Sequence, residues 1–307
     1  MPRPPHLKTQ RGQIRLLRNE ALRQFETGRS CRILRHQQSS TFRLELDSGE
    51  VQFLRFSRFE DRTAEQLTSE TQWLRELQSM PFAVPAPIPW DGEDFLRPAL
   101  GESYFLTRTT WCPGRVHRRP TREKWFQIGT AMAHLHAHTL GRHDLGAARW
   151  DVDEVTGSDG EFESGLRLVE EKLGHDSRLL FERLNNRYQQ ERNSLGSLQL
   201  IHADLHPGNV LFGESTIAIV DFDDCGFAPA LYDLVVAITE MAEPSLESDF
   251  LAGYGSVRPS PYDLKAIPLV SAVRWAQEVL YSLDGEHARP QQCHKTMRKL
   301  RQSAAQW

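Results

Sequence analysis

The stretch that decides the fold runs IHADLHPGNVLF over residues 201–212 and continues with IAIVDFDD over residues 217–224. Its short apolar runs predict buried strands, and its Pro-Gly pair predicts a turn between the first two of them. The chemically active side chains, Asp204, Asn209 and Asp221, then fall at strand ends. We therefore expect three oxygen-bearing side chains to converge on one site.

These three residue types suit phosphoryl transfer. Asn209 and Asp221 supply the hard oxygen donors that Mg²⁺ prefers, while the metal keeps water and substrate phosphates as its other ligands. Asp204 is then left to accept the proton of an attacking hydroxyl group. The alternative interpretation is that the acids and the asparagine only occupy turns, as such residues commonly do.

The motif His202-x-Asp204-x-x-x-x-Asn209, with Asp221 seventeen residues after Asp204, resembles the signature of the aminoglycoside phosphotransferase and choline kinase family. Members of this family resemble protein kinases in fold, and the likeness extends roughly over residues 31–241. The resemblance implies that Asp204 is the catalytic base, that Asn209 and Asp221 bind Mg²⁺, and that His202 supports the loop. It also implies that ATP is the phosphoryl donor.

The order of the predicted elements indicates an α+β protein with two lobes, as in protein kinases. We expect an N-terminal leader and helix at 1–30 and a small nucleotide-binding lobe with an antiparallel sheet and one helix at 31–112. A larger, mostly helical lobe with the catalytic loop and the acceptor-binding helices should follow at 113–307. The boundary lies at Pro113-Gly114, which breaks the strand predicted just before it.

The smaller lobe contains a predicted ion pair. Along the helix expected at 64–77, the leucines at 67, 74 and 77 form one stripe, and Glu70 lies in its middle. A buried carboxylate needs a cationic partner, and Arg55, on the strand expected at 51–56, is the candidate. The resemblance implies that Arg55 also contacts the ATP phosphates. The alternative is that Arg55 extends to water.

Two features depart from the kinase pattern. Arg55 stands where kinases normally carry lysine, and its planar guanidinium is not interchangeable with a compact ammonium group. The expected turn at 37–40 between the first two strands has no glycine, so it lacks a glycine-rich phosphate loop. Ser39 and Ser40 are therefore the candidates to donate hydrogen bonds to the nucleotide phosphates from this turn.

Composition narrows the class of protein. The 307 residues include 37 basic and 41 acidic side chains, a formal net charge of −4, which argues against nucleic acid as a partner. The apolar runs are short and the mean hydropathy is −0.52, so we expect no membrane partner. The four cysteines are scattered, and the N-terminal region has no apolar signal segment. We therefore expect a cytoplasmic protein with buried or idle thiols.

Histidine patterns offer a competing metal-site hypothesis. His202, Asp204 and His206 alternate along the chain, as a zinc triad on one strand face would. His134 and His138 have the i, i+4 spacing of zinc ligands on a helix, but no third ligand follows. His136 shares the apolar stripe of that helix, so we interpret it as a hydrogen-bonded core residue.

The helical lobe should also support the loop and bind the acceptor. Asp233 lies near the start of a helix expected at 229–242, and the resemblance implies that it holds the catalytic loop, although an acid favoured by the helix dipole is an equal reading. An aromatic group beside acids suits an ammonium-bearing acceptor. The possible acceptor-binding residues are Asp223, Asp224, Trp275 and Glu278. For Trp275, core packing is the favoured account.

The sequence thus predicts an ATP- and Mg²⁺-dependent kinase that phosphorylates a hydroxyl group of a small molecule. An amine-bearing acceptor is expected, such as an aminoglycoside, an amino sugar, an amino alcohol or a homoserine-like compound. Two alternatives remain open: a kinase-like protein acting on protein serine or threonine, and an ATP-binding regulator without activity. The oligomeric state does not follow from the sequence.

Overall fold

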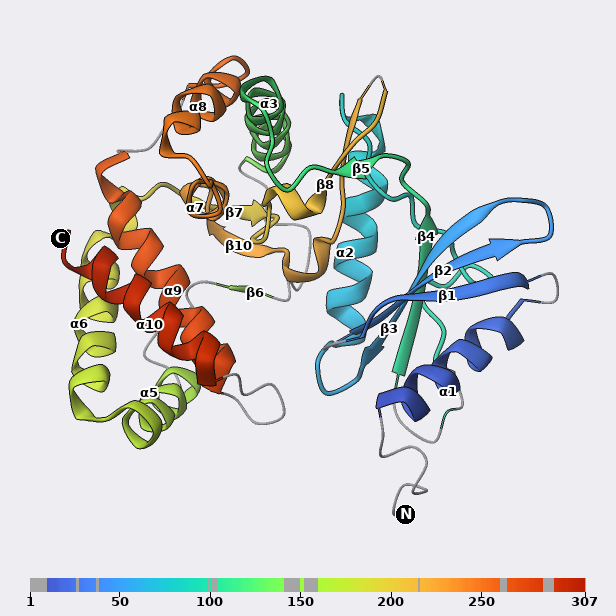
Figure 1. Cartoon of the computed structure of the whole chain (residues 1–307), viewed down its shortest axis with the longest axis horizontal. Coiled ribbons are helices and arrows are strands. Elements are labelled where there is room, and N and C mark those ends of the chain that lie inside the picture. Colours follow the sequence, from blue (N-terminus) through green and yellow to red (C-terminus); the bar gives the residue numbers. More distant parts are fainter. Residues whose placement is uncertain are drawn as a thin grey trace. The chain divides into compact units, whose positions relative to one another are not determined.

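The computed structural model describes most of the chain (Figure 1). The described residues are 10–25, 28–36, 39–98, 100, 104–140, 150–151, 160–214, 216–259, 264–283 and 290–306. The chain divides into two compact units. Unit 1 comprises residues 1–114, 145–147 and 213–220, and unit 2 comprises the rest.

Unit 1 is built on a four-stranded antiparallel sheet with the strand order β1-β2-β3-β4. Its elements are α1 (Gln10–Arg23), β1 (Gly28–His36), β2 (Ser39–Leu46), β3 (Val51–Arg58), α2 (Ala64–Glu76), the 3₁₀ turn η2 (Leu77–Ser79), β4 (Tyr104–Thr110) and β9 (Ile217–Ile219). Strands β2 and β3 form an antiparallel hairpin, with Phe42 opposite Leu54 and Thr41 opposite Arg55, and the turn between them contains Gly49.

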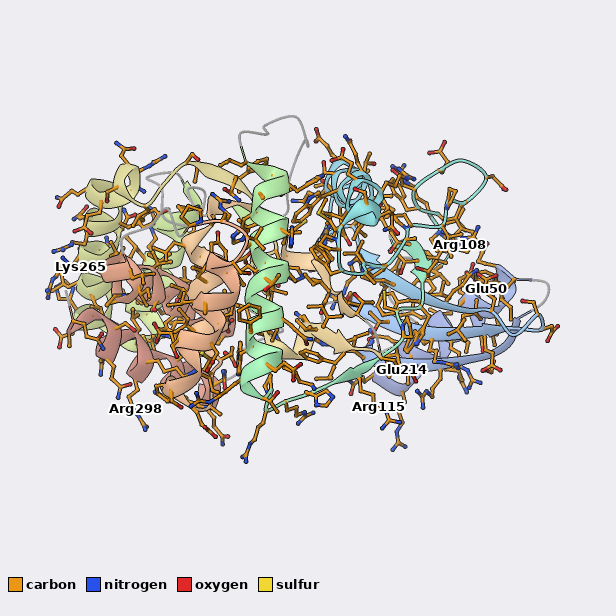
Figure 2. The ribbon with its side chains drawn as sticks, turned by 90° about the horizontal axis from the view of Figure 1, so that it is seen from above. Glu50, Arg108, Arg115, Glu214, Lys265 and Arg298 are labelled. Atoms are coloured by element: carbon orange, nitrogen blue, oxygen red, sulfur yellow. The ribbon has the colours of Figure 1, made fainter. Side chains whose placement is uncertain are left out.

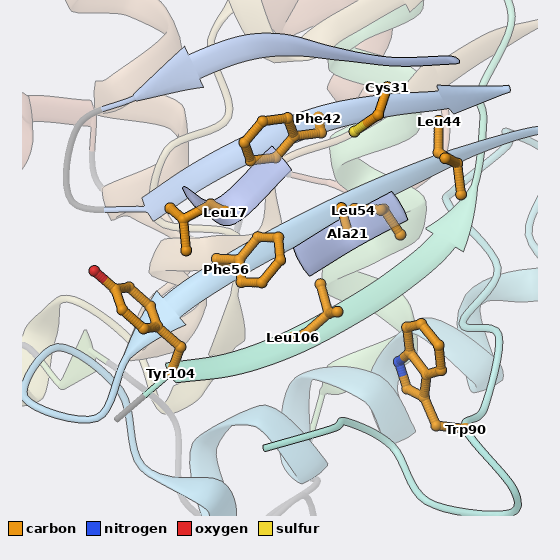
Figure 3. Packing of buried hydrophobic residues seen from close by; sticks show 10 residues of the cluster. All are labelled: Leu17, Ala21, Cys31, Phe42, Leu44, Leu54, Phe56, Trp90, Tyr104 and Leu106. Atoms are coloured by element: carbon orange, nitrogen blue, oxygen red, sulfur yellow. The ribbon is translucent and has the colours of Figure 1, made fainter. Parts of the chain in front are cut away.

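One face of this sheet carries the core of unit 1 (Figure 3). Because side chains alternate along a strand, Phe42 of β2 and Leu54 and Phe56 of β3 point to the same side. There they pack with Leu17 and Ala21 of α1. Arg55 lies between Leu54 and Phe56, so the alternation directs it to the opposite face, where α2 supplies its partner.

Helix α2 begins with a capping box. The Thr63 hydroxyl accepts a hydrogen bond from the backbone N–H of Gln66 at 3.1 Å, and the Gln66 side chain accepts one from the backbone N–H of Thr63 at 3.0 Å. This reciprocal pair satisfies two backbone donors that a helix start leaves open. The start of α2, and with it the position of Glu70, is therefore set by local sequence.

Unit 2 is mainly helical. Its helices are α3 (Arg122–Thr139), α5 (Gly160–Leu173), α6 (His175–Glu191), α7 (Leu231–Thr239), α8 (Glu247–Gly255), α9 (Ile267–Leu283) and α10 (Pro290–Ala304), with 3₁₀ turns η3 (Arg192–Ser194), η4 (Pro207–Asn209), η5 (Phe222–Asp224), η6 (Pro244–Leu246) and η7 (Leu264–Ala266). Together with the sheet of unit 1, these helices confirm the predicted α+β fold class.

The strands of unit 2 are short, and the loop that contains Asp204 and Asn209 lies between β7 and β8. They are β5 (Arg115–Val116), β6 (Trp150–Asp151), β7 (Leu198–Ile201), β8 (Val210–Phe212) and β10 (Gly226–Pro229). Strand β10 pairs with β7 antiparallel and with β6 parallel. The helix expected from Pro229 begins instead at Leu231, because Pro229 ends β10 opposite Leu198.

Helices α3 and α8 pack closely side by side at two glycines (Figure 1). A Cβ atom added to Gly129 of α3 would meet the Phe250 carbonyl oxygen and would come 2.8 Å from the Tyr254 backbone nitrogen. A Cβ atom added to Gly253 of α8 would in turn meet the Phe126 carbonyl oxygen. The backbones of the two helices are therefore in direct contact.

The state of the cysteines and the hydrophobicity of the helices can also be examined in the structure. All four cysteines are free and buried, as the sequence predicts. Within the described ranges, no helix combines the length and the apolar character that crossing a bilayer requires.

Candidate active site

The loop after β7 brings Asp204 and Asn209 together. The Asn209 side-chain amide donates hydrogen bonds to the Asp204 backbone oxygen at 2.9 Å and to its carboxylate Oδ2 at 3.0 Å. Both bonds use the NH₂ group, and the Oδ1 oxygen of Asn209 has no hydrogen-bond partner among the described residues. One hard oxygen donor is thus left for a cation beside a carboxylate.

His206 is the second neighbour of Asp204. Its Nδ1 accepts a hydrogen bond from the backbone N–H of Gly208 at 2.9 Å, so the proton of the neutral ring lies on Nε2, which is 3.5 Å from the Asp204 Oδ2. A side chain at position 208 would collide with this ring, since an added Cβ would lie 2.8 Å from the Nδ1. The Pro-Gly turn therefore allows the histidine to face the aspartate.

The surroundings keep Asp204 ionised. Burial alone would raise the pKa of its carboxyl group, but His206, His202 and, to a smaller extent, Arg274 together outweigh burial, so the pKa lies below its ordinary value. The pKa of His206 is raised: burial would lower it, but the nearby Asp204 carboxylate and the charge of Glu240 have the larger combined effect. Asp204 can therefore accept a proton at neutral pH.

The backbone before Asp204 is held by Asp233. Its carboxylate accepts hydrogen bonds from the backbone N–H groups of His202 at 3.0 Å and Ala203 at 2.8 Å. Ala203 has a φ of 64°, the left-handed region that costs an L-residue about 1–2 kcal/mol. Charge-assisted hydrogen bonds of this kind offset that cost. The carboxylate thus holds the loop, as the resemblance implied, and is not only a helix-dipole acid.

Asp233 is itself anchored by His136. The His136 Nε2 lies 3.0 Å from the Asp233 Oδ2, and its Nδ1 lies 3.0 Å from the hydroxyl of Tyr254. His136 and Asp233 are fully buried. Gln199 of β7 donates hydrogen bonds to the His136 carbonyl and the Thr139 hydroxyl, both at 3.1 Å. The prediction that His136 is a hydrogen-bonded core residue is confirmed.

His202 is also a buried residue. Its Nδ1 accepts a hydrogen bond from the Asp204 backbone N–H at 3.3 Å, and its ring packs against Phe222 with 4.7 Å between centroids. The left-handed turn at Ala203 breaks the alternation that the zinc hypothesis required of His202, Asp204 and His206. No group of three metal-binding His, Cys, Asp or Glu side chains occurs in the described part of the chain.

Asp221, the second expected Mg²⁺ ligand, directly precedes η5. Its φ of 67° lies in the left-handed region, which aspartate tolerates better than most residues, and its side chain is exposed. The donor set, a carboxylate and an amide oxygen, is of the kind that Mg²⁺ prefers. Asn209 and Asp221 therefore fit the metal that the sequence predicts.

Unit 1 contains the expected ion pair. A single guanidinium nitrogen of Arg55, Nη2, donates to both Glu70 carboxylate oxygens, at 2.9 and 2.7 Å. A second arginine, which the sequence analysis missed, joins them: Arg62 Nη2 lies 2.8 Å from Glu70 Oε2 and is 2 % exposed. Two guanidinium groups thus share the carboxylate of Glu70.

The serines expected in a phosphate-binding turn lie in a strand instead. Ser39 and Ser40 open β2 and pair with Ser57 and Phe56 of β3. The Ser40 hydroxyl is 2.6 Å from the Nδ1 of His36 and its side chain is 4 % exposed, so this hydroxyl already has a partner. The expected turn is therefore shorter, and its residues 37 and 38 lie outside the described residues.

The expected acceptor residues lie around α9 and η5. Trp275 is buried, and the Lys299 ammonium lies 3.9 Å from the centre of its ring. A cation of the chain itself thus occupies a ring face, so the structure favours the core-packing account. Glu278 is half-buried, and burial raises its pKa. Asp223 and Asp224 are half-buried in η5.

Three of the four residues that were not predicted from the sequence were missed for the same reason. Gln199, Tyr254 and Arg274 have partners distant in sequence, up to 118 residues away for Tyr254 and His136. Only Arg62 had a local signal, because it directly precedes the helix cap at Thr63. A charged residue next to a predicted cap can reach the first turns of the helix.

Comparison with known proteins identifies one family. Residues 30–264 match the model of the phosphotransferase enzyme family. A homoserine kinase of Ralstonia nicotianae is 28 % identical over 66 % of this chain and 63 % of its own length. The chain therefore spans just under two thirds of that relative.

Two solved structures are similar in fold. A microcompartment-associated aminopropanol kinase superposes with a TM-score of 0.74, at 23 % identity and over 95 % of both chains. An amicoumacin kinase, solved in complex with AMP-PNP and Ca²⁺, has a TM-score of 0.67 at 18 % identity over 90 % of this chain and 88 % of its own.

Proposed function

Because the chain belongs to the phosphotransferase enzyme family, we propose that it transfers the γ-phosphoryl group of ATP to a hydroxyl group of an amine-bearing small molecule. The observation that carries the proposal is the pairing of Asp204 with Asn209 on a loop held by Asp233. A base and a metal-binding amide are thereby fixed in contact before any ligand binds.

Asp204 orients the acceptor hydroxyl and takes its proton while the new O–P bond forms. Its lowered pKa keeps the carboxylate ionised and ready as an acceptor at neutral pH. The Asn209 amide donates to one carboxylate oxygen of Asp204 at 3.0 Å, so the base cannot rotate freely. Preorganisation of this kind lowers the barrier because no group has to reorient during the reaction.

Asn209 and Asp221 are the proposed Mg²⁺ ligands. A bound Mg²⁺ would neutralise charge on the ATP phosphates. In unit 1, Arg55 is the proposed phosphate contact, with Glu70 and Arg62 fixing its direction. Ser39, by its backbone, remains a candidate donor to the phosphates, whereas the Ser40 hydroxyl is already bonded to His36. The amicoumacin kinase solved with an ATP analogue and a divalent cation supports this assignment.

The alternatives predicted from sequence receive less support. A protein kinase would need an activation loop after Asp221, but η5 and β10 fill residues 222–229. A regulator without activity would have no need for a buried network that holds Asp204. Homoserine and aminopropanol, named for two similar proteins, are small hydroxyl compounds with an amine, and Glu278 and Asp224 are the proposed partners of that amine.

The test is ADP release that depends on an added acceptor, measured with a panel of amino alcohols, amino sugars and hydroxy amino acids. With an active acceptor, Asp204→Asn should lower kcat by at least ~10², the usual effect of losing a positioned general base. Affinity for AMP-PNP, measured by calorimetry, should stay nearly unchanged.

The matched control is Asp176→Asn, an exposed aspartate of α6 in the same unit, which should keep full activity. Wild-type turnover in Asp204→Asn would remove this residue from the mechanism. Phosphorylation of a protein substrate in place of the small molecules would support the kinase alternative instead.

A further inference from the structure

Arg274 of α9 is a buried cation without a complete set of partners. Its side chain is 6 % exposed, and its Nη1 has no hydrogen-bond partner among the described residues. The nearest acid contact, Glu240 Oε1, lies 3.7 Å from Nη2, beyond hydrogen-bond distance. An incompletely paired buried charge costs several kcal/mol, so the Nη1 of this guanidinium still lacks a hydrogen-bond acceptor.

Arg274 lies within electrostatic reach of the proposed base. Its positive charge acts on Asp204 and on Tyr232 in the sense that lowers the pKa of both groups. Tyr232 in turn experiences the negative charges of Asp204, Asp224 and Glu278. All these residues belong to unit 2. Hydrogen bonds make the same connection: Tyr232, which donates to Gln277 of α9, directly precedes Asp233, whose carboxylate binds the backbone just before Asp204.

Gln277 supplies a second buried donor on the same helix. Its side-chain oxygen accepts a hydrogen bond from the Tyr232 hydroxyl at 2.7 Å, which turns the amide in a defined direction. Its Nε2 is buried and, like the Nη1 of Arg274, has no partner in the part of the chain that the structure describes. Residues three apart on a helix are neighbours. Two open donors thus lie next to each other.

Glu278 stands one helical turn after Arg274, yet the two do not form an ion pair within 4.0 Å. The carboxylate of Glu278 is half-buried and has no hydrogen bond or ion pair among the described residues. An unpaired acid beside an incompletely paired cation matches a ligand that carries both charges. A ligand with an ammonium group alone would leave Arg274 and Gln277 unsatisfied.

We propose that Arg274 and Gln277 bind the carboxylate, and Glu278 the ammonium group, of a hydroxylated amino acid whose hydroxyl group is presented to Asp204. This assignment rests on the proposed kinase activity and names its acceptor class. In the reaction the hydroxyl oxygen forms a bond to the γ-phosphorus, the bond from that phosphorus to the β–γ bridging oxygen breaks, Asp204 takes the hydroxyl proton, and ADP leaves.

Three acceptor compounds of matched length test the carboxylate and the ammonium group of the ligand separately. L-Homoserine carries both groups, 3-amino-1-propanol lacks the carboxylate, and 4-hydroxybutanoate lacks the amine. L-Serine with ethanolamine and 3-hydroxypropanoate forms a shorter set. In the series whose chain length suits the site, the kcat/KM of the wild type should be at least ~10² higher for the amino acid than for the amino alcohol or the hydroxy acid. A site built to bind a polar group rejects compounds that lack it.

Substitutions then assign each charge to a residue. Arg274→Gln should raise KM for the amino acid and abolish the preference over the amino alcohol, and Arg274→Lys should restore part of it. Glu278→Gln should abolish the preference over the hydroxy acid. The control is Arg298→Gln, which removes an exposed arginine of the neighbouring α10 (Figure 2) and should keep both preferences.

The outcomes distinguish this inference from the function on which it rests. Phosphorylation of amino alcohols or amino sugars without preference for a carboxylate overturns the acceptor class and leaves the kinase intact. An equal loss for all acceptors in Arg274→Gln overturns the role of Arg274 in acceptor binding. No ADP release with any acceptor contradicts the proposed function itself. If Arg274→Gln does not fold, calorimetric titration of the wild type with the three probes decides the same question.

Discussion

The carboxylate of Glu70 balances two buried guanidinium groups, those of Arg55 and Arg62. In Glu70→Gln both guanidinium groups would lose this counter-charge. We expect the free energy of unfolding, measured by urea titration, to fall by about 3–5 kcal/mol, as when one partner of a buried ion pair is removed. Glu65→Gln on the exposed face of the same helix should change it by less than ~0.5 kcal/mol.

Arg62→Met tests the contact of Glu70 with Arg62 separately from its contact with Arg55. It keeps the ion pair of Arg55 and Glu70 and should therefore destabilise the protein less than Glu70→Gln does. Equal stability of the Glu70→Gln variant and the wild type would mean that the cluster is not held by charge.

The buried thiols give a prediction about pH. Burial raises the pKa of Cys31 and of Cys112 to about 11, from an ordinary value of 9.0. Since the thiolate is the reactive form, iodoacetamide at pH 8 should label these two residues in the native protein about a hundredfold more slowly than in urea. Peptide mass spectrometry of labelled protein would measure both rates. Native rates as fast as those in urea would show that the thiols are accessible.

The same shift affects stability at high pH. The unfolded chain loses these thiol protons above about pH 9, whereas the folded chain keeps them until about pH 11. The native state therefore binds more protons in this window, and its stability should fall as the pH rises from 9 towards 11.

Single residues also show what the sequence could and could not predict. Glu70 was found because helical periodicity is a local pattern, and Asp204 and Asn209 because they form a short motif. The incomplete pairing of Arg274 on α9 becomes visible only once Glu240 and Tyr232, which are distant in sequence, are in place. A partner set by tertiary packing leaves no local pattern.

Helices α3 and α8 depend on the absence of two side chains. Gly129→Ala and Gly253→Ala would each push a methyl group into the backbone of the facing helix. We expect a loss of at least ~1–3 kcal/mol in the free energy of unfolding, the range of overpacked cores, measured by denaturant titration with circular dichroism.

Gly255→Ala is the control in the same helix. A Cβ atom at this position meets no atom within 4 Å, so stability should stay the same or rise by up to ~1 kcal/mol through better helix propensity. Similar losses in all three variants would attribute the effect to glycine replacement in general and not to the contact between the helices.

Element boundaries followed the sequence where local rules act. The capping box fixed the start of α2, and the glycine-containing turn fixed the hairpin of β2 and β3. Pro229 was misplaced in a helix because proline suits both a first helical turn and the end of a strand. Pro229 belongs to the strand because it pairs with Leu198 of β7.

For the whole protein, ligand binding should appear as added stability. Mg²⁺ and AMP-PNP together, at a hundred times the Kd, should stabilise the folded state by ~2.7 kcal/mol and raise the Tm by several degrees. EDTA should remove the shift. Asp221→Ala should lack it, and Asp176→Asn should retain it. A full shift in the presence of EDTA, by differential scanning fluorimetry, would contradict the metal assignment.

The left-handed backbone at Ala203 has a consequence for how this enzyme tolerates change. The conformational cost of this backbone is offset by hydrogen bonds that Asp233, His136 and Tyr254 form across three helices. A variant that weakens these contacts will first let the backbone of Ala203 leave its left-handed conformation. The carboxylate of Asp204 will then lose its orientation while the rest of the fold persists. Activity should therefore decline at temperatures well below those that melt the protein.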